Sequence, residues 1–247
     1  MNTQTIVLQE CLDQYGVSRR QFLKFCGLMT ATLALPARYG SRVAHALLTS
    51  PRPPVVWLEF QDCTGDTESF LRASQPGVDE LVLDLLSLDY HETLMVPAGA
   101  MTEKSLSDTV ANFPGQYLCV VEGSIPTAAG GIHCMIRGRT ALSIAQEVCG
   151  NALATLAVGT CAFDGGIGAA FPNPTGAVGV RDAIPGLQPL INLPGCPATV
   201  VNITATVVHF LTFGEWPSTD ERGRPHFAYG EEIHEECERH DHYEEER

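Results

Sequence analysis

The stretch Val55-Val56-Trp57-Leu58-Glu59-Phe60-Gln61-Asp62-Cys63-Thr64-Gly65-Asp66-Thr67-Glu68-Ser69 joins an apolar run, a short polar loop and the start of a helix. Residues 55–60 contain five apolar side chains and follow two prolines, a pattern typical of a buried parallel strand. The last three residues of the stretch are capping types, which predicts a helix over residues 69–74 that Pro76-Gly77 ends. Ligands of an open α/β sheet bind beyond the carboxyl ends of its strands, so Cys63 and Asp66 are candidate site residues.

The same strand and helix rhythm continues along the chain. Apolar runs predict strands over residues 89–96, 117–126 and 154–160, the last of which places Cys161 at its carboxyl end. Amphipathic patterns predict helices over residues 78–87, 102–112, 140–149 and 200–213. This alternation specifies an α/β fold with a doubly wound parallel sheet. The Gly- and Pro-rich segments 164–168, 172–176 and 193–199 are predicted to be functional loops outside the sheet.

Length and charge limit the classes of function. The chain has 247 residues, 45% of them hydrophobic, and a formal net charge of -14, so it can bury a substantial core. The negative charge argues against nucleic acid and anionic membrane surfaces as partners. Residues 231–247 carry nine acidic and two basic side chains, a sum of -7, and are predicted to be a solvated segment.

The amino-terminal residues have the pattern of an export signal. Ser18-Arg19-Arg20-Gln21-Phe22-Leu23-Lys24 is a twin-arginine motif, followed by the apolar run 25–36 and the small-residue cleavage site Ala44-His45-Ala46. We therefore expect residues 1–46 to be a removable leader, the twin-arginine export machinery to be a partner, and the location to be periplasmic. An ordinary basic helix start is the alternative. Proteins exported by this route fold and take up cofactors before they cross the membrane.

Nine cysteines stand in the sequence, of which Cys11 and Cys26 fall in the expected leader. The remaining seven are widely spaced, and their odd number means that disulfides alone cannot account for them. Metal or cluster ligation therefore competes with burial of free thiols. Cys119 lies in a predicted strand and Cys149 in a predicted helix, so both are expected to be buried structural thiols, and the role of Cys134 stays open.

Four ordered motifs carry a resemblance to a known family. They are Cys63-Thr64-Gly65-x-Thr67-Glu68-Ser69, Gly159-Thr160-Cys161-Ala162, Pro172-Asn173-Pro174-Thr175-Gly176 and Leu193-Pro194-Gly195-Cys196-Pro197. In order and spacing they resemble the small subunit of nickel-iron hydrogenases. The resemblance implies a flavodoxin-like domain whose loops hold a proximal [4Fe-4S] cluster, with Cys63, Cys161 and Cys196 as thiolate ligands. It also implies an obligate heterodimer with a hydrogenase large subunit, which holds the nickel-iron centre, and a cytochrome b or another membrane electron acceptor.

Two positions depart from the pattern that the resemblance implies. Asp66 stands where a fourth cysteine is usual. It either ligates iron through a carboxylate oxygen, or the site holds a three-iron cluster or is degraded. Oxygen-tolerant members carry extra cysteines at positions that match Gly65 and Gly166 here, so their protection mechanism is not expected.

The end of the chain is a third departure. Residues 229–237 resemble the start of a distal cluster site, in which His234 and Cys237 would be ligands on one helical turn. Further cluster ligands would lie beyond residue 247, so we expect either a fragment or a product without its electron-relay domain. The predicted domains are a leader at 1–46, a flavodoxin-like domain at 47–215 and a truncated iron-sulfur segment at 216–247.

The resemblance implies an enzyme subunit, active as an oxidoreductase only with its large partner. The expected function is electron transfer in a periplasmic uptake hydrogenase. Two alternatives from other classes stay open: a non-catalytic docking subunit, and a cluster-bearing subunit of a quinone-reducing complex. The export motif counts against the second, and against a hydrogen sensor, because both work inside the cell.

Overall fold

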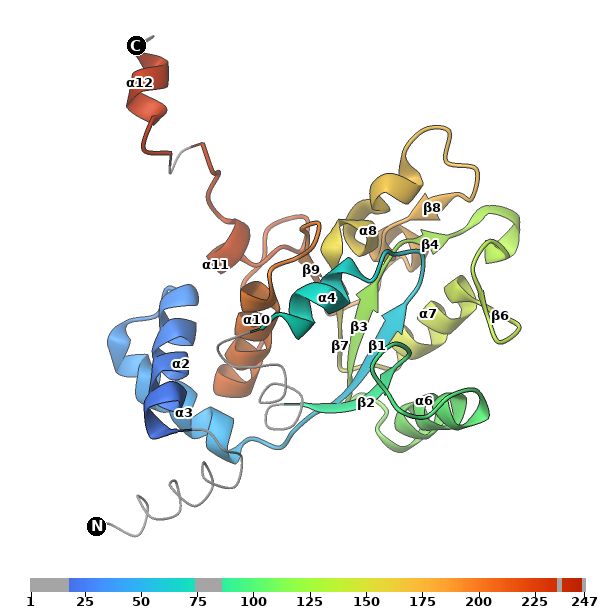
Figure 1. Cartoon of the computed structure of the whole chain (residues 1–247), viewed down its shortest axis with the longest axis horizontal. Helices are drawn as coiled ribbons and strands as arrows, with labels where there is room; N and C mark the ends of the chain where they lie inside the picture. The colour runs from blue at the N-terminus through green and yellow to red at the C-terminus, as the bar shows by residue number, and fades with distance from the viewer. Residues whose placement is uncertain (1–17, 74–85, 235–236, 246–247) are drawn as a thin grey trace.

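The computed structural model describes residues 18–73, 86–234 and 237–245. Its centre is a parallel sheet of five strands among these residues, in the order β2-β1-β3-β7-β9 (Figure 1). The strands are β1 Pro54–Glu59, β2 Ser87–His91, β3 Leu118–Glu122, β7 Ala154–Val158 and β9 Leu190–Leu193. Consecutive strands are joined by crossovers, and all neighbouring pairs are parallel, so the predicted α/β class with a doubly wound parallel sheet is confirmed.

Helices and short hairpins connect the strands. The helices among the described residues are α2 Arg19–Thr32, α3 Gly40–Thr49, α4 Gly65–Leu71, α6 Ala100–Asn112, α7 Ala141–Gly150, α8 Gly159–Asp164, α9 Val180–Ala183, α10 Val200–Phe213, α11 His226–Tyr229 and α12 His240–Glu244. Two antiparallel pairs stand apart from the main sheet, β4 Ile125–Pro126 with β8 Ala177–Val178 and β5 Met135–Ile136 with β6 Arg139–Thr140. None of the helices in the described ranges has the length and apolarity needed to cross a membrane.

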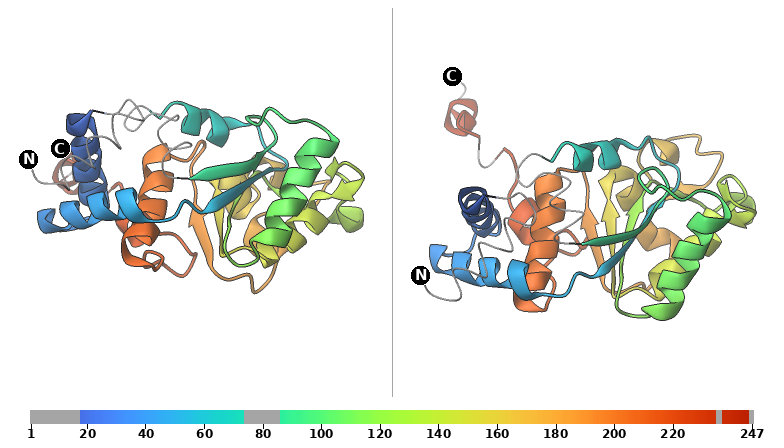
Figure 2. Two further views of the ribbon diagram at one scale, coloured as in Figure 1. Left: turned by 90° about the horizontal axis from the view of Figure 1, so that it is seen from below. Right: turned by 60° about the horizontal axis from the view of Figure 1, so that its bottom comes forward.

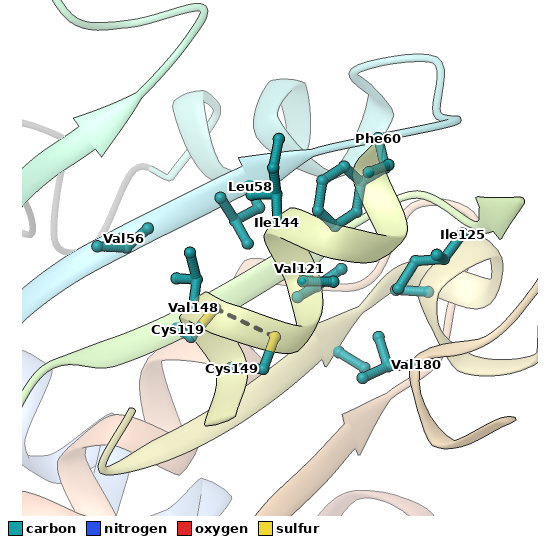
Figure 3. Packing of buried hydrophobic residues seen from close by; sticks show 14 of the residues in the cluster. Val56, Leu58, Phe60, Cys119, Val121, Ile125, Ile144, Val148, Cys149 and Val180 are labelled. Atoms are coloured by element: carbon teal, nitrogen blue, oxygen red, sulfur yellow. Dashed lines mark hydrogen bonds between the residues drawn. The ribbon is translucent and has the colours of Figure 1, made fainter. Parts of the chain in front are cut away.

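Both faces of the sheet are covered, because alternate residues of each strand point to opposite sides. Val56 and Leu58 pack in one core against α6 and α7, while Val55 and Trp57 pack in a second core against α4 and α10. Figure 1 shows α7 and α10 on opposite sides of the strands. Figure 3 shows the first core, in which the Sγ atoms of Cys119 and Cys149 lie 3.7 Å apart. Both thiols are buried, as predicted.

A third apolar cluster lies outside the two cores. It joins α2 and α3, which contain most of the described part of the expected leader, to α10 (Figure 2). The residues after α10 also return to the sheet: the Asn192 side chain donates to the Arg222 carbonyl at 2.6 Å, and the Tyr229 hydroxyl donates to the Pro194 carbonyl at 2.8 Å. The segments on both sides of the predicted domain boundaries at residues 46 and 215 therefore pack against the sheet domain.

Several predicted element boundaries are wrong. The helix predicted at 69–74 begins at Gly65, and the strand predicted at 154–160 ends at Val158, so Cys161 lies in the first turn of α8. The predicted helix at 78–87 falls mainly outside the described residues, but Ser87 begins β2, and that strand ends at His91 rather than at 96.

Strand β9 is the strand of the main sheet that the sequence did not predict. Leu193 was expected in a loop, yet it ends a strand that pairs with β7, with Val158 opposite Leu193. The strand is only four residues long and contains Asn192, which is 1% exposed. An apolar run so short, interrupted by an amide and bounded by prolines, carries little strand signal. The buried backbone edge of β7 and the hydrogen bonds of Asn192 to residues 222 and 223 stabilise it.

Candidate functional site

Three loops meet at the carboxyl edge of the sheet. They follow β1, β7 and β9 and are taken together with the first turn of the helix that comes next. The first carries Cys63 and also Asp66 of α4, the second carries Cys161 of α8, and the third carries Cys196. Because these strands are parallel, their carboxyl ends lie along one edge, which brings together loops separated by up to 133 residues of sequence. The family resemblance implied this convergence for Cys63, Cys161 and Cys196, with Asp66 in the place of a fourth cysteine.

Backbone and side-chain hydrogen bonds tie the three loops to one another. The Thr160 amide donates to the Gly195 carbonyl at 2.8 Å, which joins the β7 and β9 loops. The Ser69 hydroxyl donates to the Ala198 carbonyl at 2.7 Å, which joins α4 to the β9 loop. The site is therefore braced before any group binds in it.

The acidic groups of the site lie within electrostatic reach of one another. Cys63 and Cys196 are exposed and Cys161 is half-buried, and all eight cysteines in the described residues are free thiols. Burial raises the pKa of the Cys161 thiol, and the nearby Cys196, Cys63 and Asp66 raise it further. Three thiols and one carboxyl placed so close together favour a cationic ligand, because a bound cation stabilises their deprotonated forms.

Asp66 is wedged between two of the loops. Its Oδ1 accepts the Ala198 amide at 2.6 Å, and the side chain is 8% exposed. Burial raises its pKa to about 6, with the Ala198 hydrogen bond opposing the rise and Glu122 adding to it. A Cβ built on Gly159 would lie 2.0 Å from Oδ2, and Gly159 has φ +84°. Only glycine satisfies both conditions, so the turn before Cys161 depends on it.

Two other glycines border the sulfur atoms. A Cβ on Gly65 would lie 3.1 Å from the Cys63 Sγ, and one on Gly166 would lie 2.8 Å from the Cys161 Sγ. These are the positions that match the extra cysteines of oxygen-tolerant proteins in the sequence resemblance. Because neither glycine has a side chain, backbone atoms border the sulfurs of Cys63 and Cys161 on these sides.

Glu122 is the site-forming residue that the sequence analysis missed. It ends β3, is fully buried, and accepts hydrogen bonds from the Asp66 and Thr67 amides, the Thr67 hydroxyl and the Trp57 indole. The two amides belong to the first turn of α4, so this carboxylate caps the helix from another strand and holds Asp66 in place. The available signal was a lone glutamate closing the apolar run 118–121.

A buried histidine and a second carboxylate extend this network. His91 ends β2, its Nε2 lies 3.2 Å from the Thr67 hydroxyl, and its Nδ1 lies 3.5 Å from Glu59 Oε2. Burial lowers the pKa of His91 to about 4, so it is neutral at pH 7. Asp62 accepts the Thr64 amide at 2.8 Å, which supports the left-handed turn at Thr64.

His234 and Cys237 lie apart from the three loops. They are exposed, and the Cys237 amide donates to the His234 carbonyl at 3.3 Å. The helical turn predicted for them includes residues 235–236, which lie outside the described residues. Over the described ranges, no three His, Cys, Asp or Glu side chains are grouped to hold a metal ion. Ligands of a polynuclear cluster are spread more widely than those of one ion.

The part of the chain that carries Cys63, Asp66, Cys161 and Cys196 is also the part that matches a known protein family. Residues 63–210 match the family profile of the NADH ubiquinone oxidoreductase 20 Kd subunit. The chain is 42% identical over 232 residues to the hydrogenase-2 small chain of Escherichia coli K12, covering 94% of this chain and 62% of that one. It is 46% identical over 236 residues to the periplasmic [NiFe] hydrogenase small subunit 1 of Nitratidesulfovibrio vulgaris, covering 95% of this chain and 74% of that one.

A solved structure gives the same result. The Ni-Fe-Se hydrogenase from Desulfomicrobium baculatum, in a reduced, active form, aligns with a TM-score of 0.74 and 34% identity over 79% of this chain and 77% of that one. The chain thus spans about three fifths of the length of its Escherichia coli relative. The motifs, the fold and the sequence relatives agree, and the chain belongs to the family of nickel-iron hydrogenase small subunits.

Proposed function

We propose that this chain is the electron-transfer small subunit of a periplasmic nickel-iron uptake hydrogenase. In this role it relays electrons from hydrogen oxidation in a large subunit through a proximal [4Fe-4S] cluster. The observation that carries the proposal is the gathering of Cys63, Asp66, Cys161 and Cys196 at one sheet edge, in a chain related to hydrogenase small subunits. The cluster would supply the one-electron chemistry, and the protein would position it and set its potential.

Three thiolates and one carboxylate are the proposed ligands. The half-buried Cys161 thiol has a raised pKa, so its proton must leave when iron binds, and cluster loading is therefore coupled to proton release. Asp66 would replace a soft sulfur by a hard oxygen. Its Oδ1 accepts the Ala198 amide, and its Oδ2 lies against the backbone of Gly159. The competing possibility is a three-iron cluster, with Asp66 acting only as a brace for the Cys196 loop.

Exposed apolar side chains next to the site favour a large partner. Ile167 and Phe171 follow α8, which carries Cys161, and are 90% and 99% exposed. Side chains of this kind standing free in water are typical of a surface that another protein covers. We propose that the hydrogenase large subunit, with its nickel-iron centre, binds over this edge.

The remaining parts of the proposal rest on sequence motifs. Residues 1–46 would serve as a twin-arginine leader. The complex would lie at the outer face of the cytoplasmic membrane, where a cytochrome b or another acceptor would receive the electrons. His234 and Cys237 would begin a distal cluster site. A cluster subunit of a quinone-reducing complex is the second candidate, because the family profile bears that description. The hydrogenase relatives at 39–46% identity favour the first.

Metal analysis of the complex tests the proposal. The chain is purified anaerobically from the periplasm with whatever binds it, and iron, acid-labile sulfide and nickel are measured. We expect about four irons per chain at the proximal site, with nickel present only when a larger partner co-purifies. Cys161→Ala should lose this iron, whereas Cys149→Ala, a buried thiol outside the site, should keep it. Equal iron in both variants would refute the assignment.

Electron paramagnetic resonance separates the two roles of Asp66. Ligation by Asp66 predicts a four-iron signal on reduction. A three-iron signal that persists after reduction and iron loading would assign Asp66 to bracing alone.

A further inference from the structure

The third apolar cluster gives α10 a face that neither core uses. Ala205 and Val208 of α10 are fully buried there, and the residues that cover them come from the amino-terminal hairpin of α2 and α3 (Figure 2). The covering side chains are buried as deeply as those of the sheet cores: Phe25, Cys26, Met29, Leu33 and Val43. Figure 2 shows α2 and α3 beside α10 in both views.

Specific contacts at the other end of α10 hold the same hairpin. The guanidinium of Arg42 lies 4.7 Å from the Phe213 ring centroid, and the Tyr39 ring lies 5.9 Å from it. The Ser50 hydroxyl donates to the Leu211 carbonyl at 3.3 Å. An apolar cluster, a cation–π contact and a hydrogen bond thus fix the hairpin along the length of α10.

In the docked hairpin, one side of the apolar run of the expected leader is buried and its basic residues are exposed. The apolar run supplies the buried side of α2, whereas Arg19, Arg20 and Lys24 are exposed. Ser18 and Gln21 form a capping box that starts α2 directly before the arginine pair. The arginines therefore stay accessible while the apolar run is covered.

The predicted cleavage site lies in the docked hairpin. Ala46 is inside α3, is 6% exposed, and its carbonyl accepts the Ser50 amide at 2.8 Å. A peptidase acts on backbone that has opened locally, so a bond held in a docked helix is cut only from the undocked state.

We propose that α10 is a docking face for the chain's own amino-terminal hairpin, residues 19–49, and that the docked hairpin protects the bond after Ala46 from cleavage. The folded subunit then displays its twin arginines and is processed only once the hairpin has left α10. The docking itself stands on the contacts above, and only the role of the hairpin as a leader rests on the proposed function.

Cys26 reports docking directly, because its thiol is 2% exposed and burial raises its pKa to about 12. The purified full chain is treated with a maleimide under native conditions, and each cysteine is then quantified by peptide mass spectrometry. Cys237, which is exposed, serves as the reference within the same molecule. We expect Cys26 to react at least about tenfold more slowly than Cys237, since reaction requires undocking.

Two variants of adjacent residues separate docking from a general change in α2. Met29→Glu places a charge in the interface, where Met29 is 1% exposed, and should raise the Cys26 rate at least about tenfold. Leu28→Glu is the matched control, because Leu28 is 39% exposed on the same helix, and should leave the rate unchanged. Val43→Glu repeats the test from α3, and trypsin cleavage after Arg42 and Arg38 should accelerate in parallel.

The inference is overturned if Cys26 in the unaltered chain reacts as fast as Cys237, or if Met29→Glu and Leu28→Glu give equal rates. The first comparison needs no variant, so poor folding of a variant cannot rescue the proposal. Iron measured on the same sample keeps the two proposals separate. A loaded cluster with unprotected Cys26 refutes docking alone, and protected Cys26 in a chain that cannot be loaded refutes the cluster assignment alone.

Discussion

The middle of the sheet and its carboxyl edge are built from the same strands but differ in chemistry. In the middle, β1 and β3 place Val56 opposite Cys119, whose Sγ lies 3.7 Å from the Cys149 Sγ in the first core (Figure 3). At the edge, the same two strands end with Glu59 opposite Glu122, both buried. A few residues along each strand therefore separate an apolar interior from a buried polar network.

This difference shows why cysteines in one chain have different roles. The thiols of the middle are enclosed by side chains from both strand and helix, and they fill space. At the edge, Cys63 and Cys196 are exposed and Cys161 is half-buried, and glycines border the sulfurs of Cys63 and Cys161. Location along the strand, rather than the presence of a neighbouring sulfur, decides which thiols are accessible to a ligand.

Removing the carboxylate of Glu122 should have the largest effect on stability. Glu122→Ala leaves the Trp57 indole, the Thr67 hydroxyl and two helix amides of α4 buried without their acceptor. We expect a loss of about 3–5 kcal/mol in the free energy of unfolding, because buried donors would remain unpaired. Denaturant titration followed by tryptophan fluorescence measures it, since Trp57 contacts Glu122.

Glu68→Ala is the matched control for this prediction. Glu68 lies in the same helix, but its side chain is exposed and pairs with the exposed Arg72 at 3.5 Å. Its removal should change the free energy of unfolding by less than about 0.5 kcal/mol. Equal losses in the two variants would show that Glu122 does not organise the edge.

The middle of the sheet was more predictable from sequence than the edge. Apolar runs such as 117–121, which are rich in β-branched residues and end at turn signals, are typical of buried strands, and the order of strands and helices then limits the topology. The edge depends on contacts between distant residues, such as Glu122 with the first turn of α4 and Asp66 with Ala198. Periodicity carries no information on such pairs. The motifs identified the cysteines of the site, but not the side chains that position them.

Exchanging one cysteine in each region should separate stability from cofactor content. Cys149→Ala removes a fully enclosed sulfur and should cost about 1–2 kcal/mol of unfolding free energy, as expected for a small cavity. Cys196→Ala removes an exposed sulfur and should cost less than about 0.5 kcal/mol before iron is loaded. Iron content should show the opposite order, with Cys196→Ala deficient and Cys149→Ala normal.

The contrast between the two regions is wrong if the variant that loses more unfolding free energy also loses more iron. A chain in which Cys196→Ala unfolds as easily as Cys149→Ala would mean that the loop sulfur is part of the core. A chain in which Cys149→Ala loses iron would mean that the buried thiols support the cluster site.

The smallest predicted effect is a pH dependence that belongs to the edge alone. Burial lowers the pKa of His91 to about 4, below its ordinary value of 6.5. As the pH falls below 6.5, His91 therefore stays neutral in the folded chain but gains a proton in the unfolded chain. Stability from this histidine is complete above pH 6.5 and is lost as the pH falls toward 4. Between pH 7 and 5.5 the unaltered chain should therefore lose about 1 kcal/mol more than His91→Gln.

Nearby carboxyls act in the opposite direction. Burial raises the pKa values of Asp62 and Asp66 to about 6, so their protonation stabilises the folded chain as the pH falls. Both are present in the unaltered chain and in His91→Gln, so the difference between the two pH profiles isolates the histidine. Parallel profiles would mean that folding leaves the pKa of His91 unshifted. A gain of stability in the unaltered chain relative to His91→Gln as the pH falls would mean that the pKa of His91 is raised, as in a buried charge pair with Glu59.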